Sequence, residues 1–82
     1  MIIVDVFVPV VNKEYDFSIN EKSPISLVIE EISEMVAQKE GFLTVKHPEN
    51  FILCNAETKG IMDTKMTLES YAIGNGGRLI LV

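Results

Sequence analysis

The chain has 82 residues, of which 48% are hydrophobic, and it carries a formal net charge of -5. A chain of this length forms one domain, residues 1–82, near the lower size at which a core needs no disulfide or metal. The acidic balance and the lack of clustered Lys and Arg argue against nucleic acid as a partner. The apolar runs are too short to cross a bilayer, and no basic segment precedes the first of them. We therefore expect a cytoplasmic protein without direct membrane insertion.

The N-terminal residues predict a β-hairpin. Residues 2–11 form a nearly continuous apolar run that Asp5 breaks, and side chains two positions apart share one face of a strand. The parity of Asp5 assigns to the buried face Val4, Val6 and Val8. Beyond the polar residues 12–14, a half-buried antiparallel strand is indicated by the alternating apolar residues Tyr15, Phe17 and Ile19. Pro9 has no N–H, so we expect it at a sheet edge or bulge near the end of the first strand.

A helix is predicted from the Ser23-Pro24 pair to about Lys39 or Glu40. The Ser23 side chain can cap the first free N–H groups, and Pro24 loses nothing at the first helical position. Gly41 suits the end of the helix. One apolar stripe faces the core and contains Ile25, Val28, Ile29, Ile32, Met35 and Val36. The outer face carries Glu30, Glu31 and Glu34, a solvated surface by default and an acidic docking surface as the alternative.

The second half of the chain predicts short elements. Residues 42–50 are a loop or short extended piece, residues 51–54 a short strand, and residues 61–62 a minimal strand. A single helical turn begins at Thr67, after which two side chains are expected in the core, Tyr71 and Ile73. The turn 74–77 then leads into a final strand at 78–82.

The pattern Thr67-Leu68-x-x-Tyr71-x-Ile73 before Leu79-x-Leu81, together with the hairpin and the helix, resembles the ubiquitin-like β-grasp fold over almost the whole chain. This resemblance implies an α+β domain in which a mixed sheet of four to five strands packs on one α-helix. The chain is most similar to the YukD-like bacterial ubiquitin-like proteins in its length, its proline at the helix start, and its Ile-x-Asn-Gly-x-x-Leu ending without a di-glycine. Gly77 departs from that pattern, because the family's turn usually carries Asp there.

The YukD-like resemblance implies a non-conjugating cytoplasmic accessory of a bacterial type VII (WXG-type) secretion system. The final strand ends at Val82 with no tail beyond it, whereas a conjugated protein needs free residues there. We therefore expect a protein-interaction module. The alternative is a ubiquitin-like modifier or sulfur carrier that acts through its C-terminal carboxylate.

No enzyme chemistry is expected. Cys54 ends an apolar run, and its one histidine candidate, His47, lies in a polar loop. A nucleophile needs a base and an orienting group within hydrogen-bond distance, and a free cysteine in such a run usually behaves as a small hydrophobe. Metal sites need further His or Cys ligands at suitable spacing. We therefore predict no catalytic residue, no cofactor and no metal.

The candidate protein-binding site is the sheet face that the helix leaves uncovered. Strand parity, with the first and last strands as neighbours, places on that face Ile3, Phe7, Ile80 and Val82. Either Ile52 or Leu53 joins them, depending on the register of that strand. Exposed apolar groups of this size suggest a partner, and the resemblance implies the same, since ubiquitin and its relatives recruit partners through the corresponding face. Two alternatives stay open, a homodimer through this face and a parity shifted by one residue.

Overall fold

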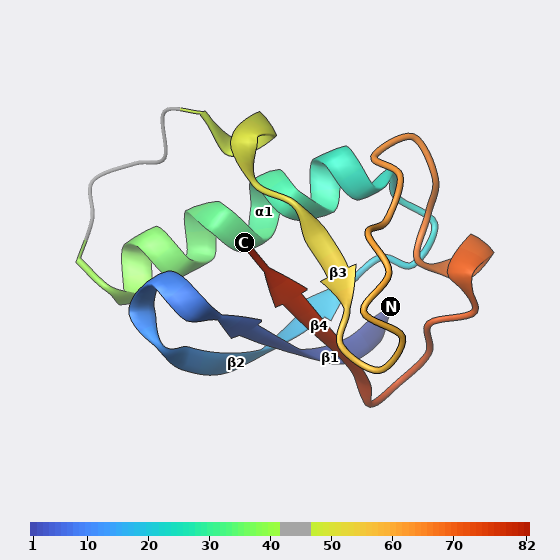
Figure 1. The fold of residues 1–82 in the computed structure, drawn as a ribbon, viewed down its shortest axis with the longest axis horizontal. Helices are drawn as coiled ribbons and strands as arrows, with labels where there is room; N and C mark the ends of the chain where they lie inside the picture. Colours follow the sequence, from blue (N-terminus) through green and yellow to red (C-terminus); the bar gives the residue numbers. More distant parts are fainter. Residues whose placement is uncertain (42–46) are drawn as a thin grey trace.

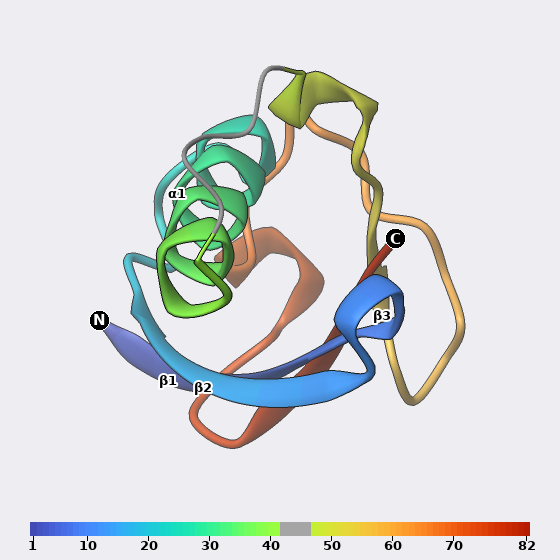
Figure 2. The same cartoon turned by 90° about the vertical axis from the view of Figure 1, so that its left-hand side faces the viewer.

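The computed structural model describes residues 1–41 and 47–82, which form a sheet packed on one helix (Figure 1). The strands are β1 (Ile2–Val8), β2 (Lys13–Ile19), β3 (Leu53–Asn55) and β4 (Gly77–Leu81), and the helix is α1 (Ile25–Lys39). The strand order is β2-β1-β4-β3. The sheet is mixed, because β1 pairs with β4 in parallel while the other two pairings are antiparallel. Figure 2 shows α1 on one side of the curved sheet, so the expected arrangement of a mixed sheet on one helix is confirmed.

The core lies between α1 and the sheet face assigned to it by strand parity. On β1 the predicted side chains Val4, Val6 and Val8 are no more than 1% exposed. The neighbouring strands supply Phe17, Ile19, Leu79 and Leu81 to the same layer. The pairing of Val6 with Leu79 places equivalent positions side by side. Because side chains alternate across a strand, the intervening residues of β1 and β4 lie on the opposite face.

The start of α1 differs from the prediction. The helix begins at Ile25, and Ser23 makes no capping hydrogen bond within it, because the N-cap position belongs to Pro24 and has no side-chain cap. Two free N–H groups are satisfied by a distant loop: Ile25 donates to the carbonyl of Met66 at 2.8 Å, and Ser26 donates to the carbonyl of Thr64 at 3.0 Å. The predicted Ser23 cap is therefore wrong, since backbone from the second half of the chain provides the acceptors.

The body of α1 follows the predicted stripe. The residues buried against the sheet are Ile25, Val28, Ile29, Ile32, Ser33, Val36 and Ala37. Met35 is partly buried. The last residue of α1 is Lys39, Glu40 is its C-cap, and Gly41 follows with φ +83°, a backbone conformation that glycine adopts without strain. The predicted end of the helix is confirmed. Within residues 1–41 and 47–82 no helix is long and apolar enough to span a membrane.

Several element boundaries differ from the prediction. β1 ends at Val8 because Pro9 opens a 3₁₀ turn, η1 (Pro9–Val11), that leads to β2. β3 begins at Leu53, while residues 61–62 contribute only an isolated bridge, between Ile61 and Cys54. Of the loop predicted at 42–50, residues 42–46 lie outside the described residues. Its last part forms η2 (Pro48–Asn50).

The turn before β4 also buries a different residue from the one predicted. It contains η3 (Glu69–Tyr71), and Tyr71 is 39% exposed, so its predicted place in the core is wrong. Leu68 is fully buried instead, and Ile73 packs against the core from a partly buried position. The Tyr71 hydroxyl accepts a hydrogen bond from the Asp63 N–H at 2.8 Å. That polar contact lies at the surface, where the hydroxyl also stays in water.

Candidate functional site

The sheet face opposite α1 carries a cluster of apolar side chains from three strands. Phe7 of β1 pairs with Ile80 of β4, and Ile80 pairs on its other side with Cys54 of β3. One step further along, the backbone of Ile52 exchanges two hydrogen bonds with that of Val82, at 2.6 and 2.9 Å. Directly paired residues lie on the same face of a sheet. We call these five residues, Phe7, Ile52, Cys54, Ile80 and Val82, the apolar patch.

Solvent reaches the apolar patch. Ile52 is 42% exposed and Val82 51% exposed, while Phe7, Cys54 and Ile80 are partly exposed. Leu53 is fully buried and pairs with Leu81 in the core. The structure therefore resolves the register that the sequence left open, because it places Ile52 rather than Leu53 on this face.

Ile3 lies on the same face but apart from the apolar patch. It is 56% exposed and lies one residue before Val4, where the pairing of β1 with β4 begins. Its carbonyl accepts the Gly76 N–H, and its own N–H donates to Oδ1 of Asn75. Four positions along a strand separate Ile3 from Phe7 by about 13 Å. The structure thus brings together three of the four predicted residues and leaves Ile3 at the far end of the face.

Charged side chains separate Ile3 from the apolar patch and border the patch on β2. Asp5 of β1 pairs with Asp16 of β2 on one side and with Arg78 of β4 on the other. Glu14 of β2 pairs with Phe7 and borders the patch directly. A hydrogen bond with the Asp5 side chain, followed by repulsion from the Asp5 charge, raises the pKa of Asp16. We call Asp5, Glu14 and Asp16 the acidic row. In the sequence, the alternation of Glu14 and Asp16 with the buried residues of β2 was the signal that could have revealed it.

A polar cluster joins the edge strand β2 to the end of α1. Tyr15 donates a hydrogen bond to the Glu40 carboxylate, and Lys13 Nζ lies 3.1 Å from the same group. The bond to Glu40 raises the pKa of Tyr15 to about 12, and the bonds from Tyr15 and Lys13 lower the pKa of Glu40. Tyr15 and Lys13 stabilise the ionised carboxylate of Glu40, and Glu40 stabilises the neutral phenol of Tyr15. The cluster therefore strengthens the attachment of β2 to α1.

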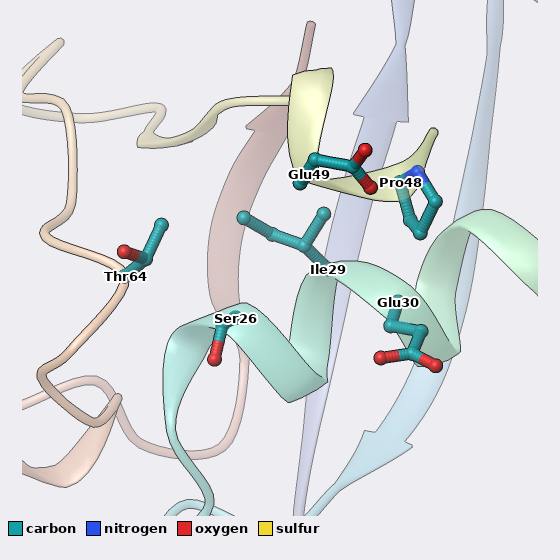
Figure 3. A pocket seen from close by; sticks show the side chains of 6 residues that line it. All are labelled: Ser26, Ile29, Glu30, Pro48, Glu49 and Thr64. Atoms are coloured by element: carbon teal, nitrogen blue, oxygen red, sulfur yellow. The ribbon is translucent and has the colours of Figure 1, made fainter. Parts of the chain in front are cut away.

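A pocket of about 250 Å³ lies between α1, η2 and the loop at Thr64. Figure 3 shows its lining from the first half of α1, from η2 and from the loop at Thr64. The lining residues are Ser26, Ile29, Glu30, Pro48, Glu49 and Thr64.

His47 lies in the predicted exposed loop and contacts Glu49 at 3.1 Å. Across residues 1–41 and 47–82 no three His, Cys, Asp or Glu side chains are placed to hold a metal ion. The predicted acidic helix face is exposed at Glu30, Glu31 and Glu34.

Comparison with known proteins identifies the fold. No family model and no curated protein matches the chain. It is similar to the solution structure of the N-terminal ubiquitin-like domain in the 4931431F19Rik protein, with 18% identity and a TM-score of 0.77 over 99% of this chain and 72% of that one. It is also similar to ATBAG1 in a crystal structure in complex with HSP70, with 16% identity and a TM-score of 0.70 over 100% of this chain and 40% of that one. The protein therefore has the predicted ubiquitin-like β-grasp fold of the α+β class.

Proposed function

We propose that the protein is a non-enzymatic interaction module that binds other proteins through the open face of its sheet. The observation that carries the proposal is the apolar patch, where apolar side chains at paired positions adjoin one another and are reached by solvent. Burying such side chains against a partner stabilises a complex by about 25 cal/mol for each Å² of apolar surface removed from water. A contiguous patch of this kind is typical of binding surfaces.

The structural neighbours support the same type of function without naming a partner. At 18% and 16% identity, the two similarities show a shared fold. One of the two neighbours, ATBAG1, is in complex with another protein, HSP70. The chain spans 40% of ATBAG1, so HSP70 is not carried over as a partner of this protein.

Affinity capture from native lysate tests the proposal with variants of Phe7 and Ile80. An aspartate at either position places a charge where a partner would remove water, and an unpaired buried charge is strongly unfavourable. We expect Phe7→Asp and Ile80→Asp to lose the captured proteins while circular dichroism shows a folded chain. The matched control is Leu27→Asp on the outside of α1, where Leu27 is 42% exposed. Retention of every captured protein by a folded Phe7→Asp/Ile80→Asp protein would contradict the proposal.

A second copy of the chain is the competing occupant of this face. Light scattering at two concentrations distinguishes the two cases. We expect a monomer at both. A dimer that Ile80→Asp splits would assign the apolar patch to self-association and would contradict a free docking face.

The finer proposal is a cytoplasmic accessory protein of a bacterial type VII secretion apparatus. It is supported by the sequence resemblance to YukD-like proteins, through the proline at the helix start and the turn that precedes the last strand. Mass spectrometry of captured proteins tests it. Components of a WXG-type apparatus should be present with the wild type and absent with Ile80→Asp. Unchanged WXG-protein secretion in cells that lack this protein would contradict the assignment.

A modifier or sulfur carrier that acts through the Val82 carboxylate is the alternative function. The backbone N–H and carbonyl of Val82 pair with Ile52, one position beyond the bounds of β4 and β3, so adenylation of this carboxylate would require the pairing to break. Incubation with ATP and activating enzymes should therefore give no adenylate. A mass increase on Val82 under these conditions would support the modifier instead.

A further inference from the structure

The charge that borders the apolar patch indicates what kind of partner fits it. On this face the carboxylates of Asp5, Glu14 and Asp16 are accompanied by one cation, Arg78 of β4. Asp5 and Asp16 occupy directly paired positions on β1 and β2, and like charges placed opposite each other in a sheet repel. A hydrogen bond with the Asp5 side chain, followed by this repulsion, raises the pKa of Asp16. Over the described residues no ion pair within 4.0 Å neutralises these three carboxylates.

We propose that the open sheet face binds a segment of a partner protein that is both apolar and basic, with its apolar side chains on the apolar patch and a Lys or Arg side chain between Asp5 and Asp16. The inference rests on the proposed function and adds the chemistry of the partner to it. A cation at that place pairs with both carboxylates and offsets the repulsion between them. Both effects favour binding of the partner.

The spacing on the sheet defines the spacing that the partner needs. Asp5 and Phe7 are two positions apart on β1, and the same step separates Arg78 from Ile80 on β4. Two positions along a strand correspond to about 7 Å. An extended segment meets this spacing with its apolar and basic residues at alternate positions, and a helix meets it approximately with residues three or four apart.

Charge also distinguishes this partner from a second copy of the chain. A two-fold dimer through this face would place two acidic rows, with three carboxylates each, in one interface. Among the outward positions of the four strands, the cation is Arg78, which pairs with Asp5. A basic partner is therefore electrostatically complementary, while a copy with net charge -5 is not.

The test uses three synthetic peptides and two double variants of the full chain. The peptides share the same Leu residues and carry Lys, Gln or Glu at two alternating positions. Amide chemical shifts of the ¹⁵N-labelled protein locate binding and give the dissociation constants. The first variant, Asp5→Asn/Asp16→Asn, removes two charges from the acidic row. The matched control, Glu31→Gln/Glu34→Gln, removes two charges from the exposed face of α1.

We expect the Lys peptide to shift the β1 and β4 amide signals and to bind at least tenfold more tightly than the Gln peptide. This advantage should disappear in Asp5→Asn/Asp16→Asn and persist in the Glu31→Gln/Glu34→Gln control. Equal binding of the Lys and Gln peptides at the apolar patch would overturn the inference and leave the proposed function standing. Failure of all three peptides to shift the signals of this face would count against both. A Lys preference that only the helix control removes would assign the basic partner to α1 and overturn the inference.

Discussion

Two neighbouring residues of β4 provide a stringent test of the sheet's two faces. Leu79 is 1% exposed and packs in the core, whereas Ile80 is partly exposed on the opposite side. Truncation of either one to alanine removes three carbon atoms. For a fully buried side chain these carbons represent about 2.4 kcal/mol of transfer free energy, and the residual cavity raises the total to about 3 kcal/mol or more.

The expected losses of unfolding free energy therefore differ about threefold. Leu79→Ala should lose about 3 kcal/mol, which in a domain of this size lowers Tm by about 12–24 °C. Ile80→Ala should lose about 1 kcal/mol, or about 4–8 °C, because its outer side is already in water and no closed cavity forms. Urea unfolding monitored by circular dichroism measures both values, provided that the two m values agree. Equal losses, or a larger loss for Ile80→Ala, would refute the assignment of faces and with it the apolar patch.

Three further predictions concern the turn before β4, the start of α1 and the polar cluster at its end. A Cβ on Gly77 would lie 2.6 Å from a side-chain carbon, whereas a Cβ on Gly74 meets nothing within 4 Å. Gly77→Ala should therefore lower the unfolding free energy measured in urea by about 1–3 kcal/mol, and Gly74→Ala should lower it by less than about 0.5 kcal/mol. Equal losses would contradict the crowding at Gly77. Ser23→Ala should change the unfolding free energy by less than about 0.5 kcal/mol, because no side-chain cap is present; a loss of 1 kcal/mol or more, typical of a removed cap, would show that Ser23 does cap the helix. Tyr15→Phe should lower Tm at pH 7, and the difference from wild type should narrow toward pH 3: the pKa of Glu40 is lowered in the folded state, so its stabilisation is present above the unfolded pKa and is lost as pH falls through the folded one. A difference in Tm that stays constant from pH 7 to pH 3 would argue against the ionised Glu40 as the acceptor.

The sequence alone determined the elements that depend on local pattern. The alternation in residues 2–8 predicted which valines are buried, because neighbouring side chains of a strand must point to opposite faces. The 3.6-residue period predicted the buried stripe of α1 for the same kind of reason. Gly41 marked the end of the helix through its tolerance of positive φ. These features follow from a few adjacent residues and need no knowledge of distant ones.

The candidate site could be predicted in part. Parity placed Phe7, Ile80 and Val82 on the open face, and the structure brings them together there. The separation of Ile3 from them could not be anticipated, because it depends on where β4 starts to pair with β1. The membership of Ile52 likewise depends on the register of an antiparallel pair, and a shift by one residue would have exchanged it with Leu53.

Only the tertiary structure decided the features that join distant parts of the chain. The first N–H groups of α1 are satisfied by the carbonyls of Thr64 and Met66 rather than by Ser23, and no local pattern reveals an acceptor about forty residues away. The acidic row exists because β1 pairs with β2 so that Asp5 meets Asp16. A sequence specifies the face on which each side chain lies through the geometry of one element, but which side chains become neighbours depends on how separate elements pair and pack, and that is a property of the whole fold.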